Sequence, residues 1–343
     1  MTNGLRWNKY YYSGEWRTGA LTGKLVDWFL CNRRELPFRN SSNPYYILVS
    51  ETMAQQTRMA ALIPYFERFI DSFPTVASLA EADEAEVLSL WAGLGYYSRA
   101  RNLHKAAREM CARHNGAVPD SEKTLRALPG VGEYTAGAVA SIAFNLPCPA
   151  VDGNVRRVYA RLFASDGGDV AGWVRSLMED APPRLVTESL MELGALICTP
   201  SAPKCGQCPV SEVCRAFLEG KVTQFPAKKQ KPVKREKHRI VCVARDEKAR
   251  VLLRRRTERL LHNMWEFPTE ERLLADGFAV TRESGPLGTA KHVFTHIVWH
   301  MTAYEASVTY DRLPEHYQWA ASPRGFALPS AMRAWICLIF AEK

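Results

Sequence analysis

Two carboxylate residues stand in sequence surroundings that favour opposite ionisation states. Glu51 lies in the strongly apolar helical stretch PYYILVSETMAQQTRMAALIPYF, where burial would raise its pKa and keep it protonated near neutral pH, as a general acid requires. Asp152 stands at the start of the helix expected in AVDGNVRRVYARLF, where the helix dipole and free amides hold it ionised. The alternatives are a solvated surface glutamate and a plain helix N-cap. One protonated and one ionised carboxyl group together are the pattern for cleaving a glycosidic bond.

Four cysteines with close spacing form a second candidate site. Cys198, Cys205, Cys208 and Cys214 follow the pattern C-x6-C-x2-C-x5-C, so four thiolates can converge on one centre. A structural zinc site and four unrelated buried cysteines are the alternatives. Zinc sites usually present two short cysteine pairs, whereas here a single CxxC is flanked by lone cysteines, and we therefore favour a [4Fe-4S] cluster. The other five cysteines are scattered along the chain: Cys31, Cys111, Cys148, Cys242 and Cys337.

A glycine-rich hairpin at about residues 120–145 could bind a phosphate group. Asp120 or Ser121 can cap a helix that runs to about Leu128, and the LPGVG segment then turns the chain into an apolar helix that begins near Glu133. Its glycines allow a tight turn, and the amides at the N-terminus of the second helix carry a partial positive charge. A phosphate fits there without any Lys or Arg. The alternative is an ordinary helical hairpin.

The elements that must position these residues fall into two domains. From about residue 21 to residue 220 the apolar spacing is helical nearly throughout, and we find no convincing strand. Residues 221–239 have eight Lys or Arg, one Glu and two prolines, which indicates a basic linker. Residues 240–343 alternate apolar and polar side chains as half-buried strands do, and a helix closes the chain. The fold class is therefore an all-α domain joined to a smaller α+β domain, with residues 1–20 as an N-terminal extension.

Length and charge limit the function further. A chain of 343 residues with a net charge of +9 predicts two domains and favours nucleic acid or an anionic membrane surface as partner. The longest uncharged stretch, residues 134–151, contains Asn145, Pro147 and Pro149, which would break a spanning helix. The N-terminus lacks the apolar segment of a secretory signal. We therefore expect a cytoplasmic protein without a membrane partner, in which cysteines bind metal or stay as thiols.

The LPGVG hairpin, the aspartate of VDGNV about twenty residues later and the cysteine cluster together resemble the helix-hairpin-helix DNA glycosylases with an iron–sulfur cluster. The chain is most similar to MutY-type adenine DNA glycosylases, from about Leu21 to the C-terminus. This resemblance implies a helical glycosylase domain, a [4Fe-4S] cluster held by the four cysteines and a Nudix-like C-terminal domain. It also implies a monomeric enzyme that removes adenine paired with 8-oxoguanine or guanine in duplex DNA and so starts base excision repair.

The resemblance assigns roles to residues that match the family's motifs. Glu51 would protonate adenine N7 and help to activate water, and Asp152 would stabilise the oxocarbenium-like sugar by its charge or through a transient covalent bond. Tyr134 and Asn154 would support these two, and the adenine would be flipped out of the duplex. Arg34, Phe38, Arg39, Ala54, Met59, Glu188 and Met191 would line the adenine pocket. Gln56, Thr57, Leu94, Gly95 and Tyr96 would enter the duplex or touch 8-oxoguanine, and Gly130, Val131 and Gly132 would bind phosphate.

Three positions depart from relatives in an informative way. The MutY family commonly has Trp at Phe38 and Leu at Ala54, which predicts a looser adenine pocket. Endonuclease III-type relatives carry a Lys at Tyr134, whose amine forms the Schiff base needed for strand cleavage. Because Tyr cannot form a Schiff base, the sequence predicts a monofunctional glycosylase. A bifunctional lyase and a non-catalytic iron–sulfur DNA-binding protein are the alternative functions.

The C-terminal domain carries a WEFP segment and strand pairs that resemble the Nudix-like domain of the MutY family. It has no REx2E motif, which a Nudix hydrolase needs to bind divalent metal at a pyrophosphate. Phe294, Thr295 and His296 match the family's Phe-Ser-His loop, which contacts 8-oxoguanine. Threonine keeps the hydroxyl group of serine and adds a methyl group. The alternative is a strand-end histidine beside a core phenylalanine.

Overall fold

The computed structural model describes residues 20–227, 233–323 and 325–340, so the expected N-terminal extension and the middle of the expected linker lie outside the described residues. Between residues 20 and 227 every regular element is helical, as predicted. The α-helices are α2 (Ala20–Asn32), α3 (Pro44–Ala54), α4 (Met59–Ser72), α5 (Val76–Glu81), α6 (Glu84–Leu90), α7 (Ser98–Arg113), α8 (Glu122–Ala127), α9 (Glu133–Phe144), α10 (Gly153–Phe163), α11 (Val170–Asp180), α12 (Pro183–Leu196) and α13 (Arg215–Leu218). Short 3-10 turns follow at Cys205–Gln207, Ser211–Val213 and Val222–Gln224.

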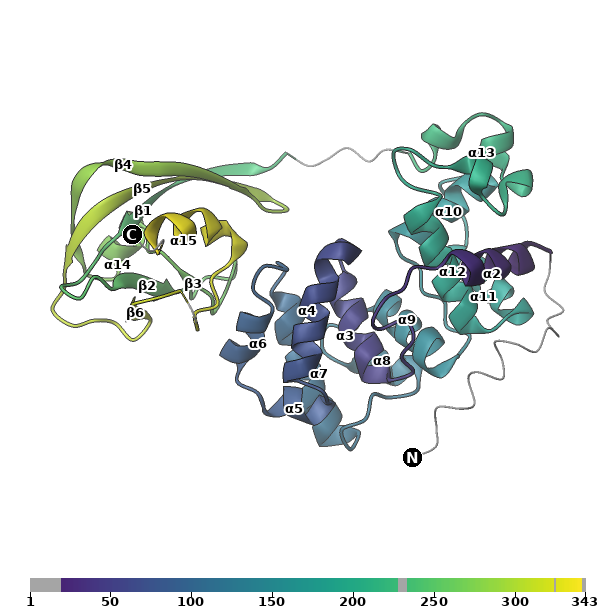
Figure 1. Ribbon diagram of the computed structural model, residues 1–343, viewed down its shortest axis with the longest axis horizontal. Helices are drawn as coiled ribbons and strands as arrows, with labels where there is room; N and C mark the ends of the chain where they lie inside the picture. The colour runs from purple at the N-terminus through teal and green to yellow at the C-terminus, as the bar shows by residue number, and fades with distance from the viewer. Residues whose placement is uncertain (1–19, 228–232, 324, 341–343) are drawn as a thin grey trace. The chain divides into compact units, whose positions relative to one another are not determined.

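The later part of the chain contains two three-stranded sheets, as its alternating pattern predicts (Figure 1). In the first sheet, β1 (Arg235–Val243) pairs in parallel with β5 (Ile297–Thr309), and β4 (Ala279–Val293) pairs antiparallel with β5. In the second, β2 (Val251–Arg255) pairs antiparallel with both β3 (Trp265–Glu266) and β6 (Tyr317–Ala320). The helices here are α14 (Glu270–Ala275) and α15 (Arg333–Ile339), with a 3-10 turn at Ser330–Met332.

Strand β1 begins inside the stretch that its charge marks as a linker. Residues Arg235 to Arg239 pair with Ile297 to Met301 of β5, and their side chains are mostly exposed. Backbone pairing decides this boundary, because charged side chains on an open sheet face remain in water while the main chain makes its hydrogen bonds.

Two compact units make up the chain, and they do not coincide with the domain boundaries that the sequence suggests. One unit contains residues 20–56 and 109–227, and the other contains residues 57–108 together with 233–323 and 325–340. The helices α4 to α6 and most of α7 therefore pack as one body with the two sheets. The division at residues 220 and 240 stays a prediction.

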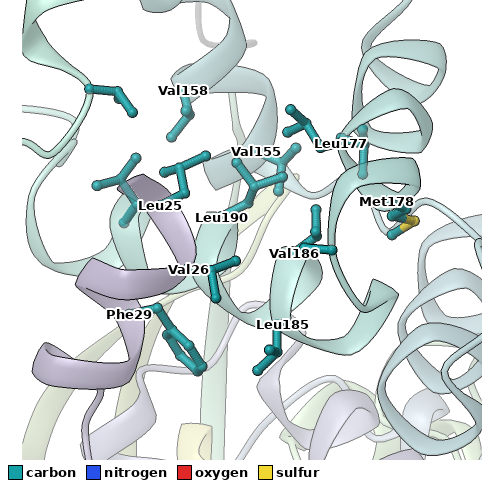
Figure 2. Packing of buried hydrophobic residues seen from close by; sticks show 14 of the residues in the cluster. Leu25, Val26, Phe29, Val155, Val158, Leu177, Met178, Leu185, Val186 and Leu190 are labelled. Atoms are coloured by element: carbon teal, nitrogen blue, oxygen red, sulfur yellow. The ribbon is translucent and has the colours of Figure 1, made fainter. Parts of the chain in front are cut away.

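The core of the first unit lies where α2, α10, α11 and α12 meet (Figure 2). Leu25 of α2, Val155 and Val158 of α10 and Leu190 of α12 lie in this cluster, and Phe29 of α2 extends it toward Leu185 of α12. Each of these side chains is at most 6% exposed. The apolar face of α10 is thus fixed against three helices, which determines where its N-terminal residue Asp152 points.

The second unit has its core between the sheets and α15. Trp299 and Met301 of β5 pack with Val241 of β1, Leu253 of β2 and Trp335 of α15, and all five are buried. No helix among the described residues is long and apolar enough to cross a membrane.

Candidate active site

Glu51 lies on α3, as predicted, with its carboxyl group enclosed by protein. The hydroxyl group of Tyr134 donates a hydrogen bond of 2.7 Å to Glu51 Oε2. Burial raises the pKa of Glu51 to about 7, although the Tyr134 hydrogen bond lowers it, and the nearby charges of Asp152 and Glu188 raise it further. A carboxyl group with this pKa holds a proton near neutral pH and can give it up, which is the property expected of a general acid.

Asp152 caps the N-terminus of α10, as its position in the sequence predicts. One carboxylate oxygen accepts a hydrogen bond of 2.7 Å from the backbone amide of Val155, and the other accepts one of 2.7 Å from Asn154 Nδ2. The side chain is half-buried, so it keeps access to a substrate. Asp152 is therefore both a helix cap and a fixed negative charge near the Glu51–Tyr134 pair, close enough to influence the pKa of both groups.

A close backbone approach brings the helix of Tyr134 against the segment that leads to Asp152. A Cβ atom at Gly137 on α9 would lie 2.3 Å from the carbonyl oxygen of Pro149, so a larger residue would push the two segments apart. At the start of the same helix, Thr135 Oγ1 accepts a hydrogen bond of 3.0 Å from Gln55 Nε2, just beyond the end of α3. These contacts position α3, α9 and the N-terminus of α10 around one site.

A buried network of arginines and glutamates lies beside this site. Glu192 is 1% exposed and accepts hydrogen bonds from Arg34 Nη2 at 2.7 Å and from Arg39 Nη2 at 2.9 Å. Burial would raise the pKa of Glu192, but these hydrogen bonds outweigh it and lower the pKa to about 2. Arg39 also lies 3.7 Å from Glu188, and Arg184 bonds to Glu188 at 3.4 Å. Both Arg39 and Glu188 influence the pKa of Glu51, so the network extends to its carboxyl group.

The remaining residues expected in the adenine pocket are only partly brought together. Phe38 is half-buried after α2, Ala54 ends α3 one turn after Glu51, and Met191 is half-buried on α12. Met59 begins α4 and belongs to the other compact unit. The roles of these four in an adenine pocket stay a prediction.

Arg157 connects Asp152 to the cysteine loop. Its Nε donates a hydrogen bond of 2.7 Å to the carbonyl oxygen of Cys198, and its Nη2 donates one of 2.7 Å to Asn154 Oδ1. Since Asn154 in turn donates to Asp152, a continuous chain of hydrogen bonds runs from the first cysteine to the Asp152 carboxylate. Arg157 is only 8% exposed, so these bonds are protected from water.

The four cysteines lie on one loop between α12 and α13. All four are half-buried, and three pack against the core of the first unit. Burial raises the pKa of the Cys208 thiol to about 11, and Cys198, Cys205 and Cys214 lie close enough to raise it further. Within the described residues no group of three or more His, Cys, Asp or Glu side chains has metal-binding geometry, so the assignment of these cysteines as ligands is a proposal.

The expected helix-hairpin-helix lies at α8 and α9. Ser121 caps α8, and Gly130 adopts a φ of 76°, which favours glycine and turns the chain toward α9. Gly132, the N-cap of α9, has no side chain that could accept hydrogen bonds from the first amides of the helix. A Cβ atom placed at Gly132 would have no other atom within 4 Å, so the space in front of it is open. The N-terminus of α9 is therefore open to a phosphate oxygen, while Val131 itself is buried.

A second cluster of predicted DNA-contacting residues lies in the other unit. Arg99, 8% exposed, donates hydrogen bonds to the carbonyl oxygens of Gly95 at 3.1 Å and Leu94 at 3.4 Å, and to Thr57 Oγ1 at 3.4 Å. Gly95 and Tyr96 both have left-handed φ values, of 73° and 48°, and the Tyr96 side chain is 46% exposed. The hydrogen bonds from buried Arg99 therefore fix the backbone of this loop, while the Tyr96 side chain remains exposed. Gln56 is exposed with a φ of 58° and belongs to the first unit, at the end of its first stretch of chain.

Phe294, Thr295 and His296 form the tip of the β4–β5 hairpin. Phe294 packs edge-on against Trp299, with ring centroids 4.7 Å apart, whereas Thr295 and His296 are exposed. The hydroxyl groups of Thr295 and Tyr96 lie 3.2 Å apart at hydrogen-bonding distance, although 199 residues separate them in the chain. The hairpin tip and the Tyr96 loop line one cavity of about 740 Å³.

Sequence reasoning missed two residues that organise the site. Arg157 follows Asn154 by three residues and so shares its helix face, which was the one available signal. Glu192 follows Glu188 by one helical turn, but its partners Arg34 and Arg39 are more than 150 residues away. Both residues act through contacts between distant segments, which the sequence alone does not reveal.

The chain matches three protein families. Residues 49–183 match the HhH-GPD superfamily base excision DNA repair proteins, residues 198–214 match the iron–sulfur binding domain of endonuclease III, and residues 240–337 match the NUDIX domain. These matches confirm the predicted helical glycosylase fold, the iron–sulfur cofactor and the Nudix-like C-terminal domain.

Individual relatives agree with these families. The chain is 34% identical to adenine DNA glycosylase of Homo sapiens, 32% to that of Mus musculus and 31% to that of Buchnera aphidicola subsp. Schizaphis graminum (strain Sg). The alignments cover 81%, 86% and 81% of this chain, and 65%, 72% and 84% of those proteins. The chain spans less than half of the Arabidopsis thaliana enzyme, at 46% of its length.

Solved structures also match the fold. A thermostable thymine-DNA glycosylase is similar with a TM-score of 0.55 and 26% identity over 58% of this chain and 95% of its own. An endonuclease III in a non-covalent DNA complex is similar with a TM-score of 0.51 and 27% identity, over 58% of this chain and 94% of its own.

Proposed function

The chain belongs to the adenine DNA glycosylase family, and on this premise we propose that it hydrolyses the N-glycosidic bond of adenine paired with 8-oxoguanine or guanine in duplex DNA. The observation that carries the proposal is the enclosed Glu51 carboxyl group, which has a pKa of about 7 and a Tyr134 hydrogen bond, beside the capping carboxylate of Asp152. Two carboxyl groups with different environments suit the cleavage of a bond between a sugar and its leaving group.

Proton transfer from Glu51 starts the reaction. The Glu51 carboxyl group donates its proton to adenine N7, so that the base can leave with the electron pair of the bond between C1′ and N9. Tyr134 holds Oε2 of Glu51 in place and so directs the other oxygen. Adenine must leave the base stack to reach this site, and its mispairing reduces the energy required.

Asp152 stabilises the positive charge that the departing base leaves on the sugar. Its carboxylate is fixed by Val155 and Asn154, so it needs no reorganisation as the charge develops. Water then adds at C1′ and gives a proton to the Glu51 carboxylate, which restores the starting state. The products are free adenine and an abasic site in an intact strand.

The cysteine loop is linked to Asp152 through hydrogen bonds of Arg157 and Asn154. Cys198, Cys205, Cys208 and Cys214 would hold the [4Fe-4S] cluster as thiolates, and these bonds would cross-link the loop. Arg157 bonds to the carbonyl oxygen of Cys198 on this loop and to Asn154, which holds Asp152. We therefore assign Arg157 as a positioning residue for the catalytic aspartate.

The Arg157→Lys variant tests this assignment. Lysine keeps the positive charge but cannot bridge Cys198 and Asn154 with one planar group. We expect the single-turnover excision rate per iron-loaded enzyme to fall by about tenfold or more, because misplaced catalytic groups lose rate steeply. Arg161→Lys is the matched control, since Arg161 donates hydrogen bonds to the carbonyl oxygens of Thr199 and Pro200 on the same loop, and among the described residues it makes none to Asn154. Equal rates per iron for both variants would assign Arg157 to loop stability alone.

The pH dependence of excision follows from the raised pKa of Glu51. Glu51 is mostly protonated below pH 7 and loses its proton as pH rises through 7, so the single-turnover rate should fall toward tenfold per unit above about pH 8. The Tyr134 hydrogen bond lowers the pKa of Glu51, so Tyr134→Phe should move this decline to higher pH. A decline that stays in place or moves to lower pH in Tyr134→Phe contradicts the assignment of Glu51 as the acid.

Recognition of 8-oxoguanine by the second unit is part of the proposal. The cavity of about 740 Å³ is lined by Tyr96, Phe294, Thr295 and His296, the residues that the family resemblance assigns to this task. The hydroxyl group of Thr295 can donate to the C8 oxygen or accept from the N7 hydrogen, two groups that distinguish 8-oxoguanine from guanine. Tyr96 also lines this cavity, and its ring can stack on a base.

Tyr134 also supports a monofunctional reaction. A lyase needs an amine at the sugar, and the Tyr134 hydroxyl group is instead bound to Glu51. Treatment with borohydride during the reaction should therefore trap no covalent protein–DNA adduct. A trapped adduct would favour the bifunctional lyase.

The partner is duplex DNA, bound by a monomer in the cytoplasm and, in a bacterium, at the nucleoid. A comparison of four duplexes tests the substrate: adenine opposite 8-oxoguanine, adenine opposite guanine, adenine opposite thymine, and cytosine opposite 8-oxoguanine. After alkali, the first two should be cut in the adenine strand and the last two should stay intact. Equal cutting of adenine opposite thymine would refute the mispair specificity.

A further inference from the structure

The cavity between the Tyr96 loop and the β4–β5 hairpin has a third wall, formed by the segment 257–263 after β2. Arg259, Leu260 and Leu261 of this segment line the cavity. The segment contains none of the residues assigned above to catalysis or to base recognition. Its backbone conformation and hydrogen bonds nevertheless hold it in one defined position.

The backbone of the segment 257–263 is costly to form. Leu261 and Asn263 adopt left-handed φ values of 60° and 59°, which non-glycine residues rarely do, least of all a bulky leucine. Backbone strain of this kind persists only where surrounding contacts enforce it, and it is concentrated at binding sites.

Two groups of contacts hold the segment in place. From the C-terminal part of the chain, buried Arg256 donates a hydrogen bond of 2.9 Å to the carbonyl oxygen of Leu260 and is itself paired with Glu266. From the helices of the same unit, Arg101 on α7 donates one of 2.9 Å to the carbonyl oxygen of His262. Asn263 donates one of 2.9 Å to Glu84 on α6.

The segment therefore presents Arg259 from a rigid support. Three cationic side chains line the cavity, and two are already engaged: Arg101 with His262, and Lys234 with the carbonyl oxygen of Phe294 at 2.7 Å. Arg259 is exposed and has no hydrogen bond or ion pair with any other described residue. An unpaired guanidinium group that lines this cavity suits an anionic ligand, and a phosphate accepts the two parallel hydrogen bonds that it can donate.

We propose that Arg259 binds a DNA phosphate flanking the nucleotide whose base enters this cavity. The inference rests on the proposed function, since it takes that nucleotide to be the 8-oxoguanosine opposite adenine. Arg259 thereby holds the damaged strand in register while Thr295 reads the base, so it contributes to the recognition of the mispair and not to the chemistry at Glu51 and Asp152.

Binding measurements with modified duplexes test the proposal. The duplex carries 8-oxoguanine opposite 2′-fluoro-deoxyadenosine, whose fluorine destabilises an oxocarbenium ion and prevents turnover. Arg259→Ala should weaken binding about tenfold and lower the slope of log K against log salt by about 1. Arg259→Lys should keep the wild-type salt slope. Arg255→Ala is the matched control, because Arg255 is an exposed arginine at the end of β2, four residues before Arg259, and does not line the cavity; we expect no change.

Neutral methylphosphonates identify the phosphate. One of the two phosphates flanking 8-oxoguanine, once replaced, should weaken binding of the wild type about tenfold and leave Arg259→Ala unchanged. If both methylphosphonates weakened binding of Arg259→Ala as much as they weaken binding of wild type, the proposal would be overturned. Equal affinity of Arg259→Ala and wild type for the unmodified duplex would overturn it as well. The single-turnover excision rate of Arg259→Ala at saturating enzyme should stay within twofold of the wild-type rate. If wild type itself shows neither excision nor preference for 8-oxoguanine, the proposed function fails, which is a separate outcome.

Discussion

The Glu51→Gln variant should bind duplex DNA with adenine opposite 8-oxoguanine and release no adenine at a measurable rate. Glutamine fills the same space and can still accept the hydrogen bond from Tyr134, but it has no proton to donate to adenine N7. General acid catalysis contributes about 10²- to 10⁴-fold, so the single-turnover rate should fall by at least this range. Quenched-flow or manual sampling followed by alkali and gel electrophoresis measures the loss.

Binding and a matched substitution complete this test. Glu67 is an exposed glutamate on α4, and Glu67→Gln should excise adenine at the wild-type rate. The affinity of Glu51→Gln for the duplex should stay near that of wild type, because Glu51 acts on the transition state. Excision by Glu51→Gln at the wild-type rate would leave Glu51 as an ordinary half-buried glutamate.

The Asp152→Asn variant should fold normally and lose most of its activity. Asparagine is as good an N-cap as aspartate, so the hydrogen bond to Val155 and the stability of α10 should be retained. The substitution removes the negative charge that faces the developing oxocarbenium ion, and it also removes the acceptor of the hydrogen bond from Asn154 Nδ2, because an amide nitrogen donates. Loss of one preorganised electrostatic contact costs about 10²- to 10³-fold in rate, and single-turnover kinetics at saturating enzyme should show this loss.

A second helix cap provides the control for this prediction. Asp169 caps α11 by accepting a hydrogen bond of 2.8 Å from the amide of Gly172, so Asp169→Asn makes the same change at another N-cap. This variant should keep the wild-type rate. If Asp152→Asn also excises adenine at that rate, Asp152 is only a cap and the proposed mechanism is wrong.

Local features of the site were predictable from the sequence, because short-range signals determine them. Ser121 and Asp152 cap helices where cap residues precede apolar periodicity, and the LPGVG segment gives the turn before α9. The raised pKa of Glu51 agrees with the apolar stretch around it, because burial is its largest cause. The caps and the turn are determined by residues within a few positions of one another, whereas the pKa of Glu51 also depends on the distant residues Tyr134, Asp152 and Glu188.

Features that depend on distant contacts were not predictable. Glu192 binds Arg34 and Arg39 across more than 150 residues, and Arg157 reaches Cys198 across 41. Residues 57–108 share a compact unit with the C-terminal sheets because Arg101, Glu84 and Tyr96 bond to loops of that region. Hydrophobic periodicity shows that a helix has a buried face, but not which distant segment covers it.

The central claim, hydrolysis of the adenine glycosidic bond, is tested most directly by following both products in water enriched in oxygen-18. A duplex with adenine opposite 8-oxoguanine is incubated with excess protein. The products are then separated, and the masses of the free base and of the DNA strand are measured by mass spectrometry. We predict one free, unlabelled adenine for each abasic site, with one oxygen-18 atom entering at C1′ and the strand intact until alkali is added. An intact duplex with no free adenine, or a strand cut without alkali and attached to the protein after borohydride, would contradict this account.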